Sequence, residues 1–199
     1  MEPSQNPLID AVTDGDLMRM HAILDAGVDP NQLMVTSGGW IVDEAGRLVS
    51  SETEDSPLVA ALRNTNFDAM KALLERGADA NLTPEGAEPP LVMAASSGRP
   101  AFVQVLLEYG AELERTGASG RTALLWAVRM NRVACAVYLY KAGAEQGALA
   151  IEWANALGFE KLSAALAVLA PESVSETVGG VDDLPPDPFA NPRRFAREP

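Results

Sequence analysis

The chain has 199 residues, 47% of them hydrophobic and 22% charged, which is enough for a domain with a sizeable core. Its net charge of −13 disfavours binding to nucleic acids and anionic membranes, since both begin with Lys and Arg neutralising phosphate, but it permits a protein partner with a basic surface. The chain has no apolar run near the ~20 residues of a membrane span, no signal-peptide pattern at its start and a lone cysteine, so we expect a soluble cytoplasmic protein.

Four segments of the chain share one layout, and a fifth, less regular copy follows them. Self-similarity of this kind is typical of repeat proteins, in which each unit packs only against its neighbours. From the second copy to the fourth, the leucine that opens the unit recurs every 33 residues; the four leucines are Leu8, Leu58, Leu91 and Leu124. We place the units near residues 6–31, 56–81, 89–114, 122–147 and 148–170.

Each unit predicts two short helices joined by a turn. Asn6, Ser56 and Thr122 stand where an N-cap side chain would accept a hydrogen bond from the first turn of a helix. Pro7 and Pro57 follow at the first helical position, where a missing N–H costs nothing. Helices of about 8–10 residues are too short to be stable alone, so neighbouring units must cover their apolar faces. A glycine suited to a left-handed conformation then ends each second helix, at Gly27, Gly77, Gly110 and Gly143.

The opening and the close of each unit are as regular as the spacing. Three units open with Pro-Leu-x-x-Ala, and the second closes with Gly-Ala-Asp-x-Asn at residues 77–81, which residues 27–31 nearly repeat. With the 33-residue period, these motifs resemble the ankyrin-repeat family. The resemblance implies an all-α repeat solenoid of about five helix–turn–helix units with hairpin fingers, within residues 1–171. The family's Thr-Pro-Leu-His motif lacks its His in every copy, so we expect apolar contacts to replace the hydrogen bonds of that motif.

The spacing of the repeats is broken between the first and second units. Residues 32–55 form a long insertion that we predict to be an extended hairpin, with strands at 40–42 and 47–49 and a turn at 43–46. In the family such fingers project at the edge of a concave face. Trp40 is therefore either an anchor for a partner or a side chain that folds back onto the first repeat.

The C-terminal end of the chain is unusual in a different way. Residues 148–170 are almost wholly apolar, whereas a terminal repeat should have a polar outer face. The Pro-rich segment 172–199 also carries apolar side chains. We expect either that part of this segment packs across the last helix pair, or that it is disordered, as its Pro and Gly content favours.

The sequence offers little that points to catalysis. His21 aligns with Lys71 and Gln104 in the next two copies, which indicates a solvent-facing position. Cys135 lies on a second helix, where it most simply packs as a small side chain. There is no Gly-rich phosphate loop, and the paired carboxylates lie in loops without apolar surroundings. We therefore predict no catalytic residue, no metal site and no cofactor.

The resemblance to ankyrin repeats implies a partner protein on the concave face, which is formed by the finger tips and the exposed side of the first helices. The fingers of the second and third units are acidic, whereas Arg residues make the fourth unit more basic. Two tryptophans at equivalent positions either form an aromatic patch or pack between repeats. Placed by position, the candidate partner-binding residues are Trp40, Glu52, Asp55, Arg63, Glu85, Glu88, Arg121, Trp126, Arg129, Met130 and Trp153.

These observations predict a non-enzymatic binding module that inhibits or protects a partner with a basic, or mixed basic and apolar, surface. The Ala-, Leu- and Val-rich composition favours a bacterial cytosolic protein. One alternative is a bacterial immunity protein that blocks the active site of a cognate toxin. The other is a structural scaffold that self-associates through its apolar last repeat.

Overall fold

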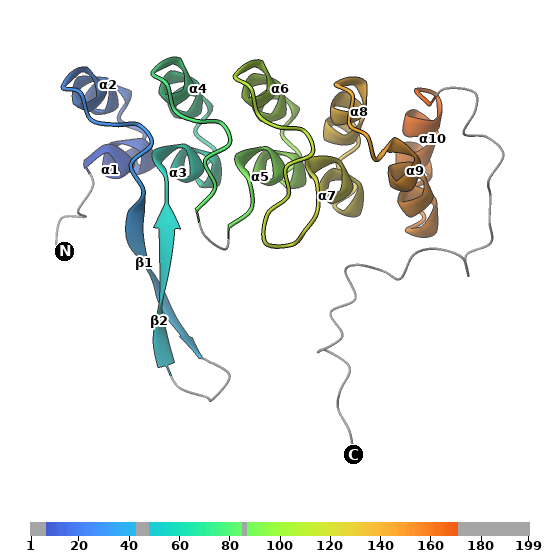
Figure 1. Cartoon of the computed structure of the whole chain (residues 1–199), viewed down its shortest axis with the longest axis horizontal. Coiled ribbons are helices and arrows are strands. Elements are labelled where there is room, and N and C mark those ends of the chain that lie inside the picture. Colours follow the sequence, from blue (N-terminus) through green and yellow to red (C-terminus); the bar gives the residue numbers. More distant parts are fainter. Residues whose placement is uncertain (1–6, 43–47, 85–86, 171–199) are drawn as a thin grey trace.

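The computed structural model describes the backbone of residues 7–42, 48–84 and 87–170, and the side chains of residues 7–33, 55–84 and 87–170. In these ranges ten helices form five consecutive pairs, stacked side by side along the long axis (Figure 1). The pairs are α1 (Pro7–Asp14) with α2 (Leu17–Asp25), α3 (Pro57–Arg63) with α4 (Phe67–Glu75), α5 (Pro90–Ser96) with α6 (Pro100–Glu108), α7 (Ala123–Arg129) with α8 (Val133–Lys141), and α9 (Gly147–Ala156) with α10 (Glu160–Ala167).

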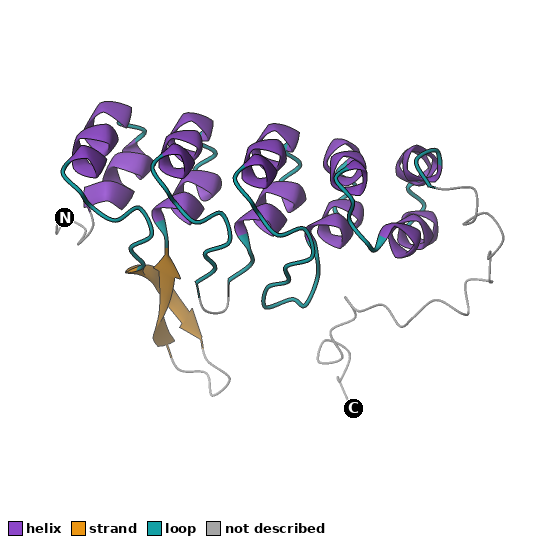
Figure 2. Cartoon of the chain, turned by 45° about the horizontal axis from the view of Figure 1, so that its top comes forward, coloured by secondary structure: helices purple, strands orange, loops and turns teal. Residues whose placement is uncertain are grey.

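The helices form two rows. The first helix of every pair lies in one row and the second helix in the other, as both views of the chain show (Figures 1 and 2). Successive first helices pack on each other from α1 to α9, and among the second helices α2 packs on α4, α6 on α8 and α8 on α10. The expected all-α repeat solenoid is confirmed.

The repeated leucines and alanines explain why the first helices pack so closely. The leucine that opens each of the first four units is buried, and so is the alanine three residues later, which lies on the same face of the helix. Small alanine side chains let neighbouring helices approach, while the leucines fill the space between rows. The result is a continuous apolar core that runs from Leu8 in α1 to Leu166 in α10.

Helix ends are capped only in part as the sequence predicts. Ser56 caps α3, because its hydroxyl accepts a hydrogen bond from the Val59 amide at 3.2 Å. Thr122 stands at the N-cap of α7 but accepts no cap hydrogen bond; its hydroxyl instead donates to the side chain of Gln146, directly before α9, at 2.9 Å. The expected capping hydrogen bond of Thr122 is therefore wrong, since the hydroxyl binds the side chain before the next helix pair instead. Asn6 lies outside the described residues.

The turn between the two helices of each pair requires a left-handed residue. Glycine fills this position in three units, where φ is 72–75°. Thr65 takes the same conformation in the second pair with φ 60°, and Asn131 in the fourth with φ 53°. A β-branched residue is strained there, whereas asparagine tolerates it. The turns thus end every first helix at the same point, and the four glycines expected to end the second helices also have positive φ, from 85° to 100°.

The insertion between the first and second units is a two-stranded antiparallel hairpin, as predicted. Strand β1 (Met34–Val42) pairs with β2 (Leu48–Asp55), and the register shifts by one residue between Ser37 and Trp40, where two glycines form a bulge. Both strands are longer than expected, because the polar segments beside the helices also pair. The turn residues 43–46 lie outside the described residues, as does the segment 172–199. The hairpin projects from the row of first helices (Figure 1).

Candidate partner-binding surface

The hairpin and the loops before α5 and α7 project in the same direction from the first helices (Figure 1). We call the side of the first helices that faces these projections the concave face. Glu88, in the loop before α5, accepts a hydrogen bond from the Ser119 amide in the loop before α7 at 3.0 Å, and the Ser119 hydroxyl accepts one from the Trp126 indole N–H at 3.0 Å. The guanidinium of Arg121 lies 5.7 Å from the centre of the indole, within cation–π range. Contacts with two loop residues therefore hold the half-buried Trp126 in place.

A second contact ties the base of the hairpin to the first helices. Asp55, the last residue of β2, is 7% exposed, and one of its carboxylate oxygens contacts the guanidinium of Arg63 at the end of α3. The expectation that Asp55 offers an acidic charge to a partner is therefore wrong, because its carboxylate is buried and forms an ion pair with Arg63. Arg63 is itself exposed and stays on the surface of the concave face.

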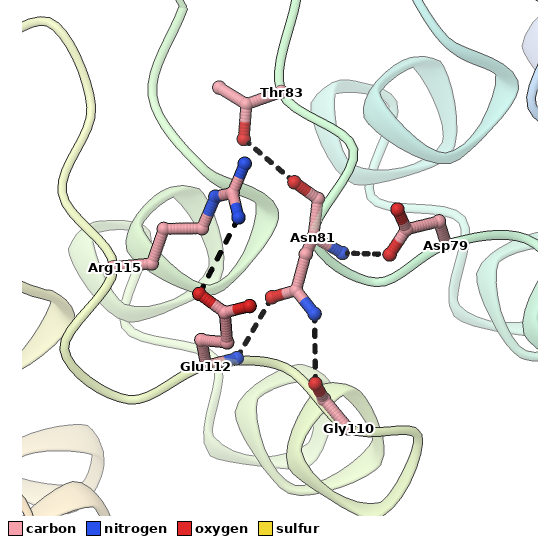
Figure 3. Close-up of polar contacts among 6 residues, drawn as sticks. All are labelled: Asp79, Asn81, Thr83, Gly110, Glu112 and Arg115. Carbon is pink, nitrogen blue, oxygen red and sulfur yellow. Dashed lines mark hydrogen bonds and ion pairs between the residues drawn. The ribbon is translucent and has the colours of Figure 1, made fainter.

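Asparagine side chains link successive repeats on the side of the second helices. The Asn81 carboxamide accepts a hydrogen bond from the Glu112 amide at 2.8 Å and donates one to the Gly110 carbonyl at 2.9 Å (Figure 3). Asn31 makes the same two contacts one unit earlier, with the Asp79 amide at 2.7 Å and the Gly77 carbonyl at 3.1 Å. Both asparagines stand out in the sequence as motif residues, but this role was not predicted for them. Polar bonds, not only apolar contacts, therefore join these repeats.

Comparison with protein-family models agrees with this geometry. The model described as "Ankyrin repeats (3 copies)" matches residues 3–116 and 58–149, which together cover most of the chain. The chain belongs to the ankyrin-repeat family. Ankyrin repeats are generally protein–protein interaction modules and generally non-enzymatic. A search of curated proteins found no match.

We call the equivalent contacts of Asn31 and Asn81 the asparagine ladder of this ankyrin-repeat protein. The ladder changes at the third unit. Glu114 stands where the first two units have Asn31 and Asn81, and its carboxylate accepts a hydrogen bond from the Glu145 amide at 2.9 Å. An ionised carboxylate has no N–H to donate, so it cannot bind the carbonyl at Gly143 as asparagine binds the equivalent glycine. The junction between the third and fourth repeats therefore lacks one of the two bonds that the earlier junctions have.

The two tryptophans that occupy equivalent positions differ in exposure. Trp153 is 7% exposed and belongs to the core, whereas Trp126 is only half-buried. The expectation of an exposed patch shared by both indoles is therefore wrong. Inter-repeat packing, the alternative that the sequence left open, describes Trp153.

The remaining candidate residues of this ankyrin-repeat protein fall into two groups. Arg129 and Met130, at the end of α7, are exposed on the row of first helices. The side chains of Trp40 and Glu52, on the paired strands β1 and β2, lie outside the described residues, as does the whole of Glu85. The described part of the site is therefore the Glu88–Ser119–Trp126–Arg121 cluster, with Arg129 and Met130 at the end of the same helix α7, and, two units earlier, Arg63 at the end of α3.

The two residues considered for catalysis, Cys135 and His21, differ in burial. Burial raises the pKa of the Cys135 thiol to about 11, although the positive charge of Arg132 acts in the opposite direction. A thiol with that pKa stays protonated at neutral pH and is a poor nucleophile. Lys71 and Gln104 are exposed, and the alignment of His21 with them predicted a solvent-facing position for it as well. His21 is half-buried instead.

Metal ligands and membrane spans can be assessed for the part of the chain that the structure describes. Within those ranges, no three or more His, Cys, Asp or Glu side chains gather where they could hold a metal ion. None of the described helices has the length and apolar character needed to cross a membrane.

Proposed function

We propose that this ankyrin-repeat protein is a non-enzymatic module that binds one partner protein through its concave face, with Trp126 as the anchor. The observation that carries the proposal is the half-buried indole, which Ser119 and Arg121 hold in a fixed orientation. Aromatic anchors that are already ordered before binding lose little entropy and supply much of the binding energy of an interface.

The proposed partner has a basic or mixed basic and apolar surface. A net charge of −13 attracts such a surface over a distance and raises the association rate more than the final affinity. Met130, 44% exposed at the end of α7, adds an apolar contact. Binding of this kind inhibits or protects the partner in the cytoplasm. Blocking the active site of a basic toxin, as a bacterial immunity protein does, is one form of such inhibition.

A binding experiment with two aromatic variants tests the anchor. Trp126→Ala removes the indole from the concave face, whereas Tyr109→Ala removes a partly exposed ring from the end of the second helix α6. The partner is captured from a lysate of the source organism, identified by mass spectrometry, purified and titrated against each variant. We expect Trp126→Ala to weaken binding by about 2 kcal/mol or more, roughly 30-fold, and Tyr109→Ala to leave it unchanged. Equal affinity for Trp126→Ala and the wild type would contradict the proposal.

Charge reversal tests the role of the acidic fingers separately. Glu52→Lys with Glu85→Lys reverses two finger charges, and we expect it to slow association without a comparable change in dissociation. Glu88 is left unchanged, because its carboxylate holds the Ser119 amide and its reversal would also disturb Trp126. An unchanged association rate at low salt would remove the fingers from the binding face.

Self-association is the second candidate function, and exposed apolar side chains in the last unit favour it. Leu157 is 47% exposed and Val168 is 85% exposed. Light scattering over a range of concentrations distinguishes the two functions, because a scaffold forms larger species as concentration rises whereas a binding module stays at the mass of one chain.

A further inference from the structure

The turns between the paired helices form an edge whose chemistry changes along the stack. In each unit, the residue at the end of the first helix directly precedes the left-handed turn residue, so these residues are equivalent. The first three are polar and the last two are apolar: Asp14, Asn64, Ser97, Met130 and Leu157. Met130 is 44% exposed and Leu157 is 47% exposed, and they lie at the ends of α7 and α9, which pack on each other. We call Met130 and Leu157 the apolar turn pair.

A positive charge lies on the same edge, two residues after Met130 and against the turn of the third unit. Arg132 is exposed, its side chain lies over Gly98, and its Nε donates a hydrogen bond to the Ser96 carbonyl at 3.0 Å. Since a carbonyl carries no net charge, this bond fixes the guanidinium without neutralising it. The turn edge of the last units therefore combines exposed apolar surface with a fixed cation, which suits a ligand with both apolar and acidic side chains.

We propose that residues 181–189 of this chain bind to the apolar turn pair. Their sequence is Val-Asp-Asp-Leu-Pro-Pro-Asp-Pro-Phe, which has three acidic residues, three large apolar residues and no Lys or Arg. The aspartates complement Arg132, and Val181, Leu184 and Phe189 complement Met130 and Leu157. The prolines favour an extended conformation before binding, which lowers the entropy lost when the segment docks.

The connecting chain is long enough for this contact. Helix α10 begins three residues after Leu157 and runs away from the turn for about 12 Å at 1.5 Å per residue. Residues 171–180 can span about 33 Å when extended. A tethered segment also acts at an effective concentration on the order of millimolar, so even weak contacts are populated.

Docking of residues 181–189 would also affect partner binding, and only this consequence rests on the proposed function. Met130 belongs both to the apolar turn pair and to the proposed partner-binding residues. The docked segment therefore covers one end of the concave face, and a partner must displace it. The docking itself requires no partner and can be tested without one.

Paramagnetic broadening in the full-length chain tests the docking. Ala190→Cys places a nitroxide label directly after the segment, while Cys135 stays unlabelled because it is fully buried and its thiol remains protonated at neutral pH. We expect the amide signals of residues 129–131 and 156–158 to be lost in the labelled chain and to return when the nitroxide is reduced. Broadening of other residues only, or of none, would overturn the proposal.

Two sets of variants separate docking at the apolar turn pair from a loss of folding and from contact between chains. Met130→Asp with Leu157→Asp should abolish the broadening, whereas Met18→Asp, at an 86% exposed position at the other end of the stack, should leave it intact. Asp182→Lys, Asp183→Lys and Leu184→Ser act on the segment and leave the repeats untouched, so they test the contact even if the first pair destabilises the fold. In a mixture of isotope-labelled and spin-labelled chains, broadening between chains would show that a second copy occupies the site, which would overturn the intramolecular contact.

Discussion

Arg63 at the end of α3 contacts the buried carboxylate of Asp55 at the end of β2. The two residues are separated by the whole of α3, so the contact joins the base of the hairpin to the far end of the helix that follows it. The hairpin is thereby fixed to the row of first helices at the edge of the concave face.

We expect Arg63→Ala to destabilise the chain by about 1–3 kcal/mol, because it leaves a buried carboxylate without its guanidinium partner. Urea unfolding followed by circular dichroism measures the loss. The matched control is Arg19→Ala, which removes an arginine whose ion pair with Asp14, at 3.8 Å, is exposed on both sides. Its cost should be below about 1 kcal/mol. Equal costs for the two variants would show that the Asp55 contact has no special role.

The asparagine ladder predicts opposite effects at two equivalent positions. Asn81→Ala removes an acceptor for the Glu112 amide and a donor for the Gly110 carbonyl, so we expect a loss of about 2 kcal/mol. Glu114→Asn supplies the missing donor at the next junction and should stabilise the chain by up to about 1 kcal/mol. Denaturation midpoints of both variants provide the test. A destabilising Glu114→Asn would mean that the third junction does not share the geometry of the first two.

Thr65 is the most strained of the turn residues, since it is β-branched and has a φ of 60°. We expect Thr65→Gly to raise stability by about 0.5–1 kcal/mol, the relief of strain exceeding the entropy cost of glycine. Asn131→Gly is the control, because asparagine already tolerates its φ of 53° and should gain less. Thermal unfolding compares the two variants. A larger gain at Asn131 than at Thr65 would contradict this interpretation.

The burial of Cys135 predicts how the free energy of unfolding changes with pH. Desolvation raises the pKa of its thiol from 9.0 to about 11, so between these values the folded chain keeps a proton that the unfolded chain releases. Stability should therefore fall as pH rises from about 9 to about 11. Urea unfolding across this range should show a steeper fall for the wild type than for Cys135→Ala. Parallel curves would mean that the thiol does not contribute.

The regular part of the fold was predictable from the sequence because each unit repeats the same local signals. The Leu and Ala spacing, the prolines at helix starts and the glycines at helix ends identify the paired helices, and the insertion before Ser56 identifies the hairpin. These signals depend on residues close together in the chain, so one sequence suffices to read them.

Contacts between units were harder to predict. Nothing local to Thr122 indicates that its hydroxyl reaches Gln146, or that Asp55 turns inward to Arg63, because both depend on how neighbouring units stack. The same holds for the tryptophans: Trp126 and Trp153 occupy equivalent positions in the sequence, yet Trp153 is buried and Trp126 is only half-buried. The asparagine ladder was the exception, since the recurrence of Asn31 and Asn81 at equivalent positions in the sequence could have revealed it.

Amide hydrogen exchange of the chain with and without its purified partner tests most directly whether the concave face is the binding surface. We predict slower exchange in the partner complex at the loop that carries Ser119, at the base of the hairpin and along α5 and α7, with no change in α4 and α6. Slower exchange confined to the second helices, with the Trp126 region unchanged, would contradict binding through the concave face.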